Sequence, residues 1–416
     1  MWKQTFESMA RRLIRTGRLT VTAPDGAVNI FGPGGDGPEA AMRFTDPAIY
    51  RRICLNPEMG LGEGYMDGTV EIDPDGLGDL LRLLMRNMDG ASDRDNEAFP
   101  LWVRWIERLR YAARGLMMRN TPLTARRNVA HHYDLSDDLY RLFLDEDWQY
   151  SCAYFARPGM TLEEAQAAKK AHIAHKLMIR PDDKVLDIGC GWGGMALTLA
   201  RDYGARVVGV TLSENQLARA RARAEAAGLS QRVEFRLLDY RKLDESFDRI
   251  VSVGMLEHVG VPQYQTYFDK VEDLLAPDGV ALIHTIGRVT PPTTQSPWLN
   301  KYIFPGGYVP SMSEMAIPIE NSGLWCTDFE VLRMHYALTL REWRARFEAN
   351  LDKVRQLNDE RFVRMWRFYL EACAVGFEEQ RMGVFQMQLA HHREALPLTR
   401  DYIYAAPEPA MVKAGE

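Results

Sequence analysis

One glycine-rich segment constrains the fold of this chain more than any other. Residues 184–194 read KVLDIGCGWGG: a short apolar run reaches a carboxylate, Asp187, and then turns through four glycines. A strand that turns through glycines into a helix is typical of a doubly wound parallel α/β sheet that binds a nucleotide-like ligand. Glycine lets the backbone approach such a ligand closely, and the free amides of the next helix favour electron-rich groups.

The segment alone allows two classes of ligand. Gly189, Gly191 and Gly194 satisfy the G-x-G-x-x-G pattern, which predicts an oxidoreductase with a nicotinamide or flavin cofactor. Asp187 favours S-adenosylmethionine instead, because a carboxylate just before the first glycine pairs with an ammonium group and repels a pyrophosphate. We therefore expect Asp187, Gly189 and Gly191 to bind S-adenosylmethionine, with the oxidoreductase as the alternative.

Polar residues also follow the next two predicted strands, at 206–210 and 232–238. The first of these strands carries no acid at its tip, where nucleotide sites usually place one to hold the ribose hydroxyls. The second ends in an acid and an aromatic residue, which suit the adenine amine and the adenine ring. The candidates for binding ribose and adenine are Thr211, Glu214, Gln216, Asp239 and Tyr240.

Strands and helices alternate from residue 184 onward. Further strands are expected at 248–254, at 280–285, ahead of His335, and at 384–389, the last as an antiparallel edge strand. This alternation predicts an α/β fold, a doubly wound seven-stranded sheet of the Rossmann-like methyltransferase type.

The first part of the chain has a different pattern, with short strand-like pieces at 19–23, 27–31 and 40–44 between Gly, Pro and Asp clusters. It predicts a smaller α+β N-terminal domain, in which the glycine-rich run 62–68 forms a structured turn. We expect an N-terminal domain at 1–115 that associates with lipid or membrane, a basic linker at 116–130 and a catalytic domain at 131–416.

Charge is unevenly distributed along the chain. The net charge of −6 argues against nucleic acid as a partner. Between residues 101 and 128, however, one acid, Glu107, stands among aromatic and aliphatic residues and seven arginines: Arg104, Arg108, Arg110, Arg114, Arg119, Arg126 and Arg127. Two interpretations stay open, a helix on an anionic membrane surface and a helix between domains with a solvated face.

The remaining patterns bear on location and metals. No apolar run approaches the ~18 residues of a membrane span, and the N-terminus lacks the apolar region of a signal peptide. We expect a cytoplasmic protein, peripheral on the inner face of the cytoplasmic membrane.

Trp2, Phe6, Met9 and Leu13 predict an opening helix that packs on its own domain. Five cysteines without C-x-x-C or zinc spacing predict reduced thiols and no metal site.

Four reactive side chains lie next to predicted strands. Cys152 precedes the sheet, Glu257 follows the fourth strand, His284 ends the fifth and Tyr336 follows the sixth. Singly, each has an ordinary structural explanation, as a small core residue, a helix N-terminal acid, a buried imidazole or a packing tyrosine. Because strand ends meet at one edge of such a sheet, together they predict a thiol, a carboxylate, an imidazole and a phenol around one small polar spot.

Six blocks stand out: HHYDLS (131–136), YSCAYF (150–155), VLDIGCGWGG (185–194), VGMLEHVG (253–260), HTIG (284–287) and YIFPGG (302–307). In order and spacing they closely resemble the cyclopropane-fatty-acyl-phospholipid synthases and their relatives, the mycolic acid cyclopropane synthases and methyltransferases. The resemblance covers nearly the whole chain.

The resemblance implies specific roles for residues. It implies a bicarbonate ion held by Cys152, Glu257, His284, Tyr336 and the backbone at Ile286. It also implies S-adenosylmethionine contacts from Tyr150, Ser151, Gly189, Thr211, Leu212, Gln216, Tyr240 and Gly254. The implied substrate is a bilayer of phospholipids with unsaturated acyl chains, and we expect a homodimer that binds no nucleic acid.

The implied reaction transfers a methylene group to a cis double bond. Methyl transfer creates a carbocation, which aromatic faces stabilise; Tyr133, Tyr154, Tyr302 and Phe304 are candidates. Bicarbonate then removes a proton so that the ring closes.

Two alternatives stay open, a methyltransferase that makes methyl- or methylene-branched chains and a lipid-binding protein without activity. Cys152 ranks as a ligand or wall residue before a nucleophile, and the segment 288–310 is interpreted equally as a lid or as a packed crossover.

Overall fold

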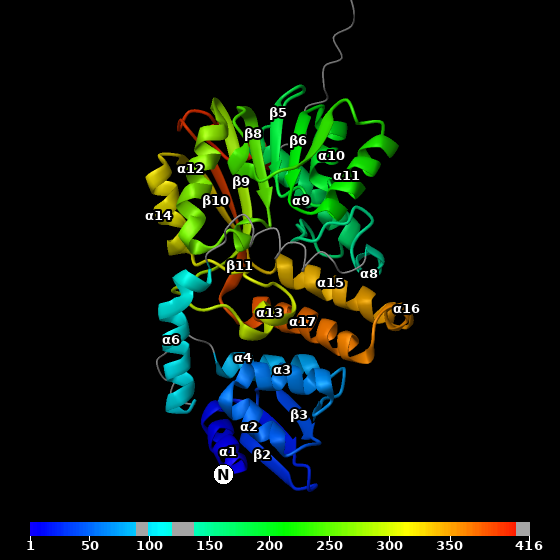
Figure 1. The fold of residues 1–416 in the computed structure, drawn as a ribbon, viewed down its shortest axis with the longest axis vertical. Coiled ribbons are helices and arrows are strands. Elements are labelled where there is room, and N and C mark those ends of the chain that lie inside the picture. The colour runs from blue at the N-terminus through cyan, green and yellow to red at the C-terminus, as the bar shows by residue number, and fades with distance from the viewer. Residues whose placement is uncertain (89–98, 119–136, 405–416) are drawn as a thin grey trace, which may run out of the picture.

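The computed structural model describes residues 1–88, 99–118 and 137–404. Their strands form two sheets, which lie toward opposite ends of the long axis of the molecule (Figure 1). The larger sheet has seven strands in the order β10-β11-β9-β8-β5-β6-β7. Their bounds are β5 (Lys184–Ile188), β6 (Arg206–Thr211), β7 (Val233–Leu237), β8 (Phe247–Val253), β9 (Leu275–Arg288), β10 (Trp325–Leu332) and β11 (Met382–Ala390). The predicted α/β fold with its seven-stranded sheet is confirmed.

One detail of the sheet prediction was wrong. β11 is antiparallel to its neighbours, as expected, but it lies between β9 and β10 and is not at the edge. The hydrophobic pattern explains this position, because β11 is buried along almost its whole length, whereas β10 is mostly half-buried or exposed. A strand buried on both faces belongs inside a sheet.

Both faces of the sheet are covered by helices, since alternate residues of its strands enter different cores. Val185 and Val207 pack with one group of helices, α9 (Leu162–Leu177), α10 (Gly194–Tyr203) and α11 (Glu214–Ala226). Leu186 and Val208 pack on the other face with α12 (Tyr264–Leu274) and α14 (Met312–Ser322). This is the doubly wound arrangement that places ligands at the carboxyl ends of the strands.

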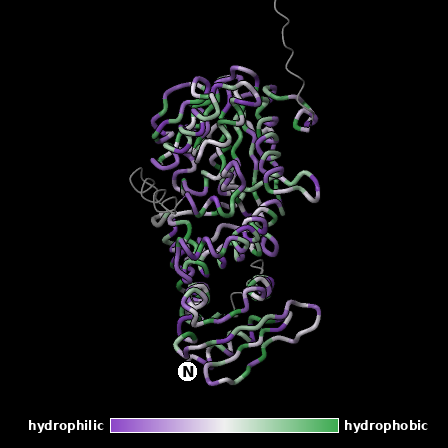
Figure 2. Tube along the Cα trace, turned by 90° about the vertical axis from the view of Figure 1, so that its right-hand side faces the viewer, coloured by the Kyte–Doolittle hydropathy of each residue, from purple (hydrophilic) through white to green (hydrophobic). Residues whose placement is uncertain are grey.

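The first 88 residues form a module around the four-stranded sheet, in the order β2-β1-β3-β4. Figure 2 shows this sheet at the end of the molecule that carries the N-terminus. Its elements are α1 (Trp2–Leu13), β1 (Gly17–Thr22), β2 (Val28–Gly34), β3 (Glu39–Phe44), α2 (Ala48–Leu55), α3 (Pro57–Asp67), β4 (Val70–Glu71) and α4 (Leu77–Asn87). Phe6, Met9 and Leu13 of α1 are buried, so this helix packs on its own module as predicted.

The glycine-rich run at 62–68 is helical and not the turn that the sequence suggested. Most of it belongs to α3, which begins with Asn56 as its N-cap, whose side chain accepts from the Met59 amide, and with Pro57 in its first turn. A Cβ on Gly62 would overlap the ring of Trp298. Here glycine allows two elements to approach closely, and the tertiary contact outweighs its low helix propensity.

Helices of the C-terminal half lie between the module and the larger sheet (Figure 1). They are α13 (Pro297–Tyr302), α15 (His335–Ala349), α16 (Leu351–Leu357) and α17 (Glu360–Glu379); α6 (Leu101–Met117), α8 (Asp137–Arg141) and α18 (Asp401–Tyr404) complete the described α-helices. One hydrophobic cluster runs from Phe6 in the module to Val384 in β11. The limits predicted for the three domains stay a prediction, and most of the linker at 116–130 lies outside the described residues.

Candidate functional site

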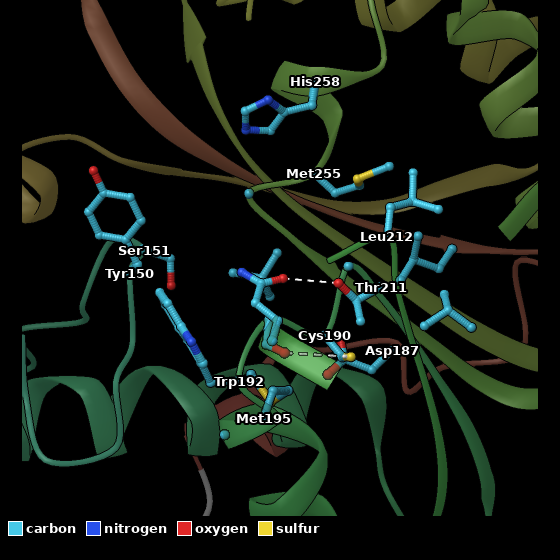
Figure 3. A pocket seen from close by; sticks show the side chains of 18 of the residues that line it. Tyr150, Ser151, Asp187, Cys190, Trp192, Met195, Thr211, Leu212, Met255 and His258 are labelled. Atoms are coloured by element: carbon cyan, nitrogen blue, oxygen red, sulfur yellow. Dashed lines mark hydrogen bonds between the residues drawn. The ribbon is translucent and has the colours of Figure 1, made fainter. Parts of the chain in front are cut away.

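A cavity of about 140 Å³ opens at the carboxyl ends of β5, β6 and β8, and we call it the glycine-loop cavity (Figure 3). Of the residues predicted to bind the cofactor, Glu214 does not line it and is exposed at the start of α11. The others do: Tyr150, Ser151, Asp187, Gly189, Gly191, Thr211, Leu212, Gln216, Asp239, Tyr240 and Gly254. The structure thus brings them together, while the ligand that they bind stays a prediction. Trp148, Trp192, Met255 and His258 also line this cavity; no sequence pattern selected their side chains.

The turn after β5 forms one wall. Gly189 and Gly191 have φ angles of +80° and +54°, in the left-handed region that favours glycine. The amides of Gly189 and Cys190 both donate to the carbonyl of Val210, at 3.0 Å each. The turn is therefore fixed to β6 and leaves the cavity beside it open.

Asp187 is the most informative charged group of this cavity. Its side chain is buried, and Oδ2 has no hydrogen-bond partner among the residues that the structure describes. Burial raises the pKa of this carboxyl to about 7. A cationic group beside Oδ2 would satisfy the unpaired acceptor and favour its charged form, so the site suits an ammonium ion.

The ribose and adenine candidates are partly engaged with one another. Thr211 Oγ1 donates to Gln216 Oε1 at 2.9 Å, which joins the tip of β6 to α11. Arg241 donates to both carboxylate oxygens of Asp239, at 2.9 and 2.6 Å. Burial acts to raise the pKa of Asp239, but the hydrogen bonds from Arg241 outweigh it and hold the pKa below its usual range. Asp239 is therefore an ionised acceptor.

A second cavity of about 600 Å³, which we call the apolar cavity, adjoins the first. Its wall contains all five predicted catalytic positions: Cys152, Glu257, His284, Ile286 and Tyr336. Tyr150, Ser151, Gly254 and His258 line both cavities. The structure therefore places the reactive side chains beside the cavity of the glycine loop.

Glu257 lies in the short 3-10 helix Leu256–His258, directly after β8. Its Oε1 accepts the backbone amide of Ile286 at 2.6 Å, while Oε2 finds no partner in the described part of the chain. Burial raises the pKa of Glu257 to about 7. The amide of Ile286, at a position predicted to hold an anion, thus donates to Glu257 in this structure.

His284 and Cys152 are both uncharged here. Gln386 Nε2 lies 3.1 Å from His284 Nδ1. With the Gln386 amide in this orientation, its nitrogen donates, Nδ1 accepts and the ring proton lies on Nε2. Burial, with the positive charges of Lys169 and Lys176, lowers the pKa of His284 well below its usual value. Burial also raises the pKa of the Cys152 thiol well above its usual range, which favours a wall residue over a nucleophile.

The predicted aromatic contacts to a cation require correction. Phe304 lines the apolar cavity. Tyr154 instead is stacked between the rings of His172 and His335, at centroid distances of 4.3 and 4.9 Å, and Tyr302 donates to Glu63 at 2.8 Å. Both tyrosines lie outside the lining because neighbouring polar groups hold them. Tyr133 lies outside the described residues.

A buried lysine was missed by sequence reasoning. Lys169 of α9 is fully buried, and its Nζ donates to Gln149 Oε1 at 2.6 Å and to Ser151 Oγ at 2.8 Å. Burial lowers its pKa to about 8. It thereby fixes the hydroxyl of a residue that lines both cavities. A lysine in a helix normally indicates a solvated position, so the sequence carried no signal for this role.

Comparisons with known proteins agree with this geometry. Residues 121–387 match the family described as mycolic acid cyclopropane synthetase, and residues 1–96 match a domain of unknown function (DUF7884). The chain is 39% identical to the cyclopropane-fatty-acyl-phospholipid synthase of Escherichia coli strain K12, over 84% of this chain and 87% of that protein. It is 34% identical to a probable fatty acid methyltransferase of Pseudomonas putida, over 89% and 93%.

A solved structure is similar to the C-terminal part. The mycolic acid cyclopropane synthase CmaA1, complexed with SAH and CTAB, superposes with a TM-score of 0.61 at 36% identity. The match covers 97% of that chain but 64% of this one. About a third of the present chain therefore has no counterpart in that structure.

We predict that S-adenosylhomocysteine binding releases a proton in slightly acidic solution. Asp187 is mostly protonated below its pKa of about 7, and a bound ammonium lowers that pKa, so binding ionises it. Calorimetry in two buffers of different ionisation enthalpy should show nearly one proton released at about pH 6 and about a tenth at pH 8.

The matched variant is Asp187→Asn, which keeps the shape and cannot ionise. It should bind about 10- to 100-fold more weakly, since a hydrogen bond to a charged group contributes roughly 1.5–3 kcal/mol, and release no proton. Equal proton release by both proteins would contradict the assignment of Asp187.

Proposed function

The chain belongs to the mycolic acid cyclopropane synthetase family, and from that premise we propose that it transfers a methylene group from S-adenosylmethionine to the cis double bond of an unsaturated phospholipid acyl chain. One observation supports this most directly. A cavity with a buried, unpaired carboxylate adjoins an apolar cavity that contains a carboxyl, an imidazole and a phenol. Such a pair of cavities suits a cationic donor next to a lipid acceptor.

The glycine-loop cavity fits S-adenosylmethionine. Asp187 offers its unpaired oxygen to the ammonium group, Thr211 and Gln216 offer polar groups to the ribose, and Tyr240 offers its ring to the adenine. When bound, S-adenosylmethionine supplies an electrophilic methyl group. Tyr150, Ser151 and the backbone at Gly254 lie on the wall common to both cavities, where the methyl group has to be transferred.

The apolar cavity suits the second half of the reaction. Methyl transfer to an isolated double bond leaves positive charge on the acyl chain, so the surrounding residues must exclude water and stabilise a cation. The rings of Phe304, Tyr150 and Tyr308 line this cavity. An aromatic face contributes about 0.5 to 2 kcal/mol to holding a desolvated cation.

The polar group of residues in this cavity fits a small anion such as bicarbonate. Burial raises the pKa of Glu257 to about 7, so near neutrality this carboxyl is partly protonated and can donate from Oε2 to an anion. His284 carries its ring proton on Nε2 and also donates. When bound, bicarbonate supplies the base that removes a proton from the new methyl group, positioned beforehand by these residues.

A second product is possible from the same site. The P. putida relative is named as a probable fatty acid methyltransferase. Loss of the proton from the carbon that carries the new methyl group gives a methyl-branched alkene instead of a ring, and a 1,2-hydride shift followed by loss of a methyl proton gives a methylene-branched chain. The positions of the described side chains suit both outcomes. The identity of the product is therefore the first property to measure.

We predict a cyclopropane product. The purified protein is incubated with S-adenosylmethionine and vesicles of unsaturated phospholipid, and the acyl chains are examined by mass spectrometry before and after catalytic hydrogenation. A chain that gains one CH2 and is not reduced under mild conditions supports the ring. A chain that gains CH2 and still takes up hydrogen at a double bond supports the branched product.

We predict that Glu257→Gln, His284→Ala and Tyr336→Phe each lower turnover while leaving the affinity for S-adenosylhomocysteine nearly unchanged. All three line the apolar cavity and are absent from the described lining of the other one. Loss of a positioned base typically costs about 10²- to 10⁴-fold in rate. Full activity of all three variants, and in buffer free of bicarbonate, would contradict this assignment.

A substrate within a bilayer requires the protein to reach a membrane surface, and we propose that helix α6 makes this contact at the inner face of the cytoplasmic membrane. No helix of the described ranges combines the length and hydrophobicity of a membrane span. On α6, Leu101, Trp105 and Leu109 are spaced four residues apart and lie about two-thirds exposed, at 68%, 61% and 62%. Exposed large apolar residues in a row indicate a contact surface.

The two interpretations of the arginine-rich stretch both find support in α6. Arg114 lies 3.5 Å from Glu314 and Trp102 donates to the carbonyl of Cys54, so one side of the helix joins the module to the catalytic part. Arg110 pairs with Glu107. Arg108 is exposed beside the apolar row, while Arg119, Arg126 and Arg127 lie outside the described residues. The predicted homodimer and the absence of nucleic acid stay predictions.

We predict that Trp105→Gln with Leu109→Gln weakens sedimentation with vesicles of phosphatidylglycerol and lowers activity on them, without changing the affinity for S-adenosylhomocysteine. Arg108→Gln should reduce the salt dependence, since a basic residue near an anionic surface contributes about 1 kcal/mol. Ile317→Gln on α14, which removes an equally exposed apolar residue (61%), is the control. Unchanged vesicle binding with a lowered oligomer mass would assign this row to contact between copies.

A further inference from the structure

The apolar cavity extends far beyond the reactive side chains, into the core of the N-terminal module. At one end its wall contains Glu257, His284 and Tyr336; elsewhere the same wall is built from Phe6, Met9, Leu19, Met42, Leu81 and Met85. These residues come from α1, β1, β3 and α4. One continuous cavity thus links the proposed reaction site to a module whose family has no known function.

We propose that the N-terminal module is the binding site for the methyl-terminal segment of the acyl chain, and that the depth of its cavity selects the position of the double bond. The inference rests on the proposed function, because it assigns the far end of the same substrate. It goes beyond that function in giving the module a ligand of its own.

The chemistry of the wall supports this ligand. Apart from Asn56 and Glu58, the side chains that the described residues 1–88 contribute to the cavity are apolar. Met9, Leu19 and Met42 are buried, at 5%, 2% and 6% exposure, so this wall is an interior and not a surface patch. Protein interiors are normally close-packed with few voids, and a cavity of about 600 Å³ is in the size range of ligand sites. A hydrocarbon chain is the ligand that such a wall suits.

The orientation follows from the polar part of the same wall. Apart from the side chains proposed to take part in the reaction, charged and hydroxyl side chains of the wall lie on α6 and on the segment before α13. There Thr294 Oγ1 donates to Glu107 Oε2 at 3.1 Å. Arg104 of α6 also lines the cavity there. Arg104 and the hydroxyl of Thr293 can donate to the oxygens of an ester and a phosphate headgroup, and the apolar row of α6 lies on the same helix. The carboxyl side of the chain therefore belongs near α6, and the methyl end in the module.

The comparison with CmaA1 is consistent with an added site. That structure matches 64% of this chain and 97% of its own, and the cyclopropane synthetase family model covers residues 121–387. The catalytic fold thus exists without the module. In the present chain the module supplies a wall of the cavity that the catalytic part does not.

The test uses three substrates that separate the two ends of the chain. Vesicles are made of phosphatidylglycerol with palmitoleoyl, cis-vaccenoyl or oleoyl chains. Palmitoleoyl and cis-vaccenoyl chains have the same methyl-side segment, whereas oleoyl has the same carboxyl side as palmitoleoyl and a methyl side that is longer by two carbons. Turnover of the wild-type protein on any of them tests the proposed function separately.

The variants change the depth of the cavity in the module. Leu19→Phe fills it and should lower kcat/KM for oleoyl relative to the other two chains by at least about tenfold, since one methylene in an apolar pocket changes it by roughly 10- to 200-fold. Met42→Ala enlarges the cavity and should shift the ratio toward oleoyl. Ile30→Phe, at an exposed position (62%) of β2 in the same module, is the matched control and should change no ratio.

Two outcomes would overturn the inference. If both cavity variants lower kcat/KM equally on all three substrates, the module is structural. If they separate cis-vaccenoyl from the two chains with the shorter carboxyl side, the module binds the opposite end. Thermal unfolding and S-adenosylhomocysteine affinity show that each variant is folded.

Discussion

The site depends on the way β9 is paired in the sheet. β9 lies between β8 and β11, and His284 stands opposite Val253 on one side and Gln386 on the other. β8 ends there, but β9 continues along β11 to Arg288, which also bridges Ser311. The Ile286 amide, which a longer β8 would have satisfied, donates instead to Glu257. The difference in strand length thus creates both the space for the site and the bond that orients its carboxylate.

Burial favours the uncharged form of the titratable groups in both cavities. It raises the pKa of Asp187 and of Glu257 to about 7 and lowers that of His284, because a low dielectric disfavours every isolated charge. The consequences differ with the neighbours. Asp187 faces a cavity suited to a cation, which would restore its charge, whereas Glu257 shares its wall with two groups that can donate to an anion.

The module and the catalytic part are joined by contacts of two kinds. Arg82 and Arg86 of α4 pair with Glu378 and Glu379 at the end of α17, and Lys301 pairs with Glu63. Such half-exposed ion pairs contribute little each, about 0–1 kcal/mol. The shared hydrophobic cluster contributes more to the association and explains why the cavity crosses from one part to the other. Ion pairs then fix the orientation in which the two walls meet.

The sequence determined the α/β fold and much of the wall of the site, because glycine spacing, strand periodicity and residues that follow strands are local properties. Asp187, Thr211, Glu257 and His284 could be selected in this way. Only tertiary structure decided the rest. Lys169 is buried, although a lysine in a helix is normally expected at the surface. Trp298, distant in sequence, packs so closely on Gly62 of α3 that no larger residue fits there. The cavity in the module forms only where two parts of the chain meet. Contacts between segments that are distant in sequence leave no local sequence pattern, so only the tertiary structure reveals them.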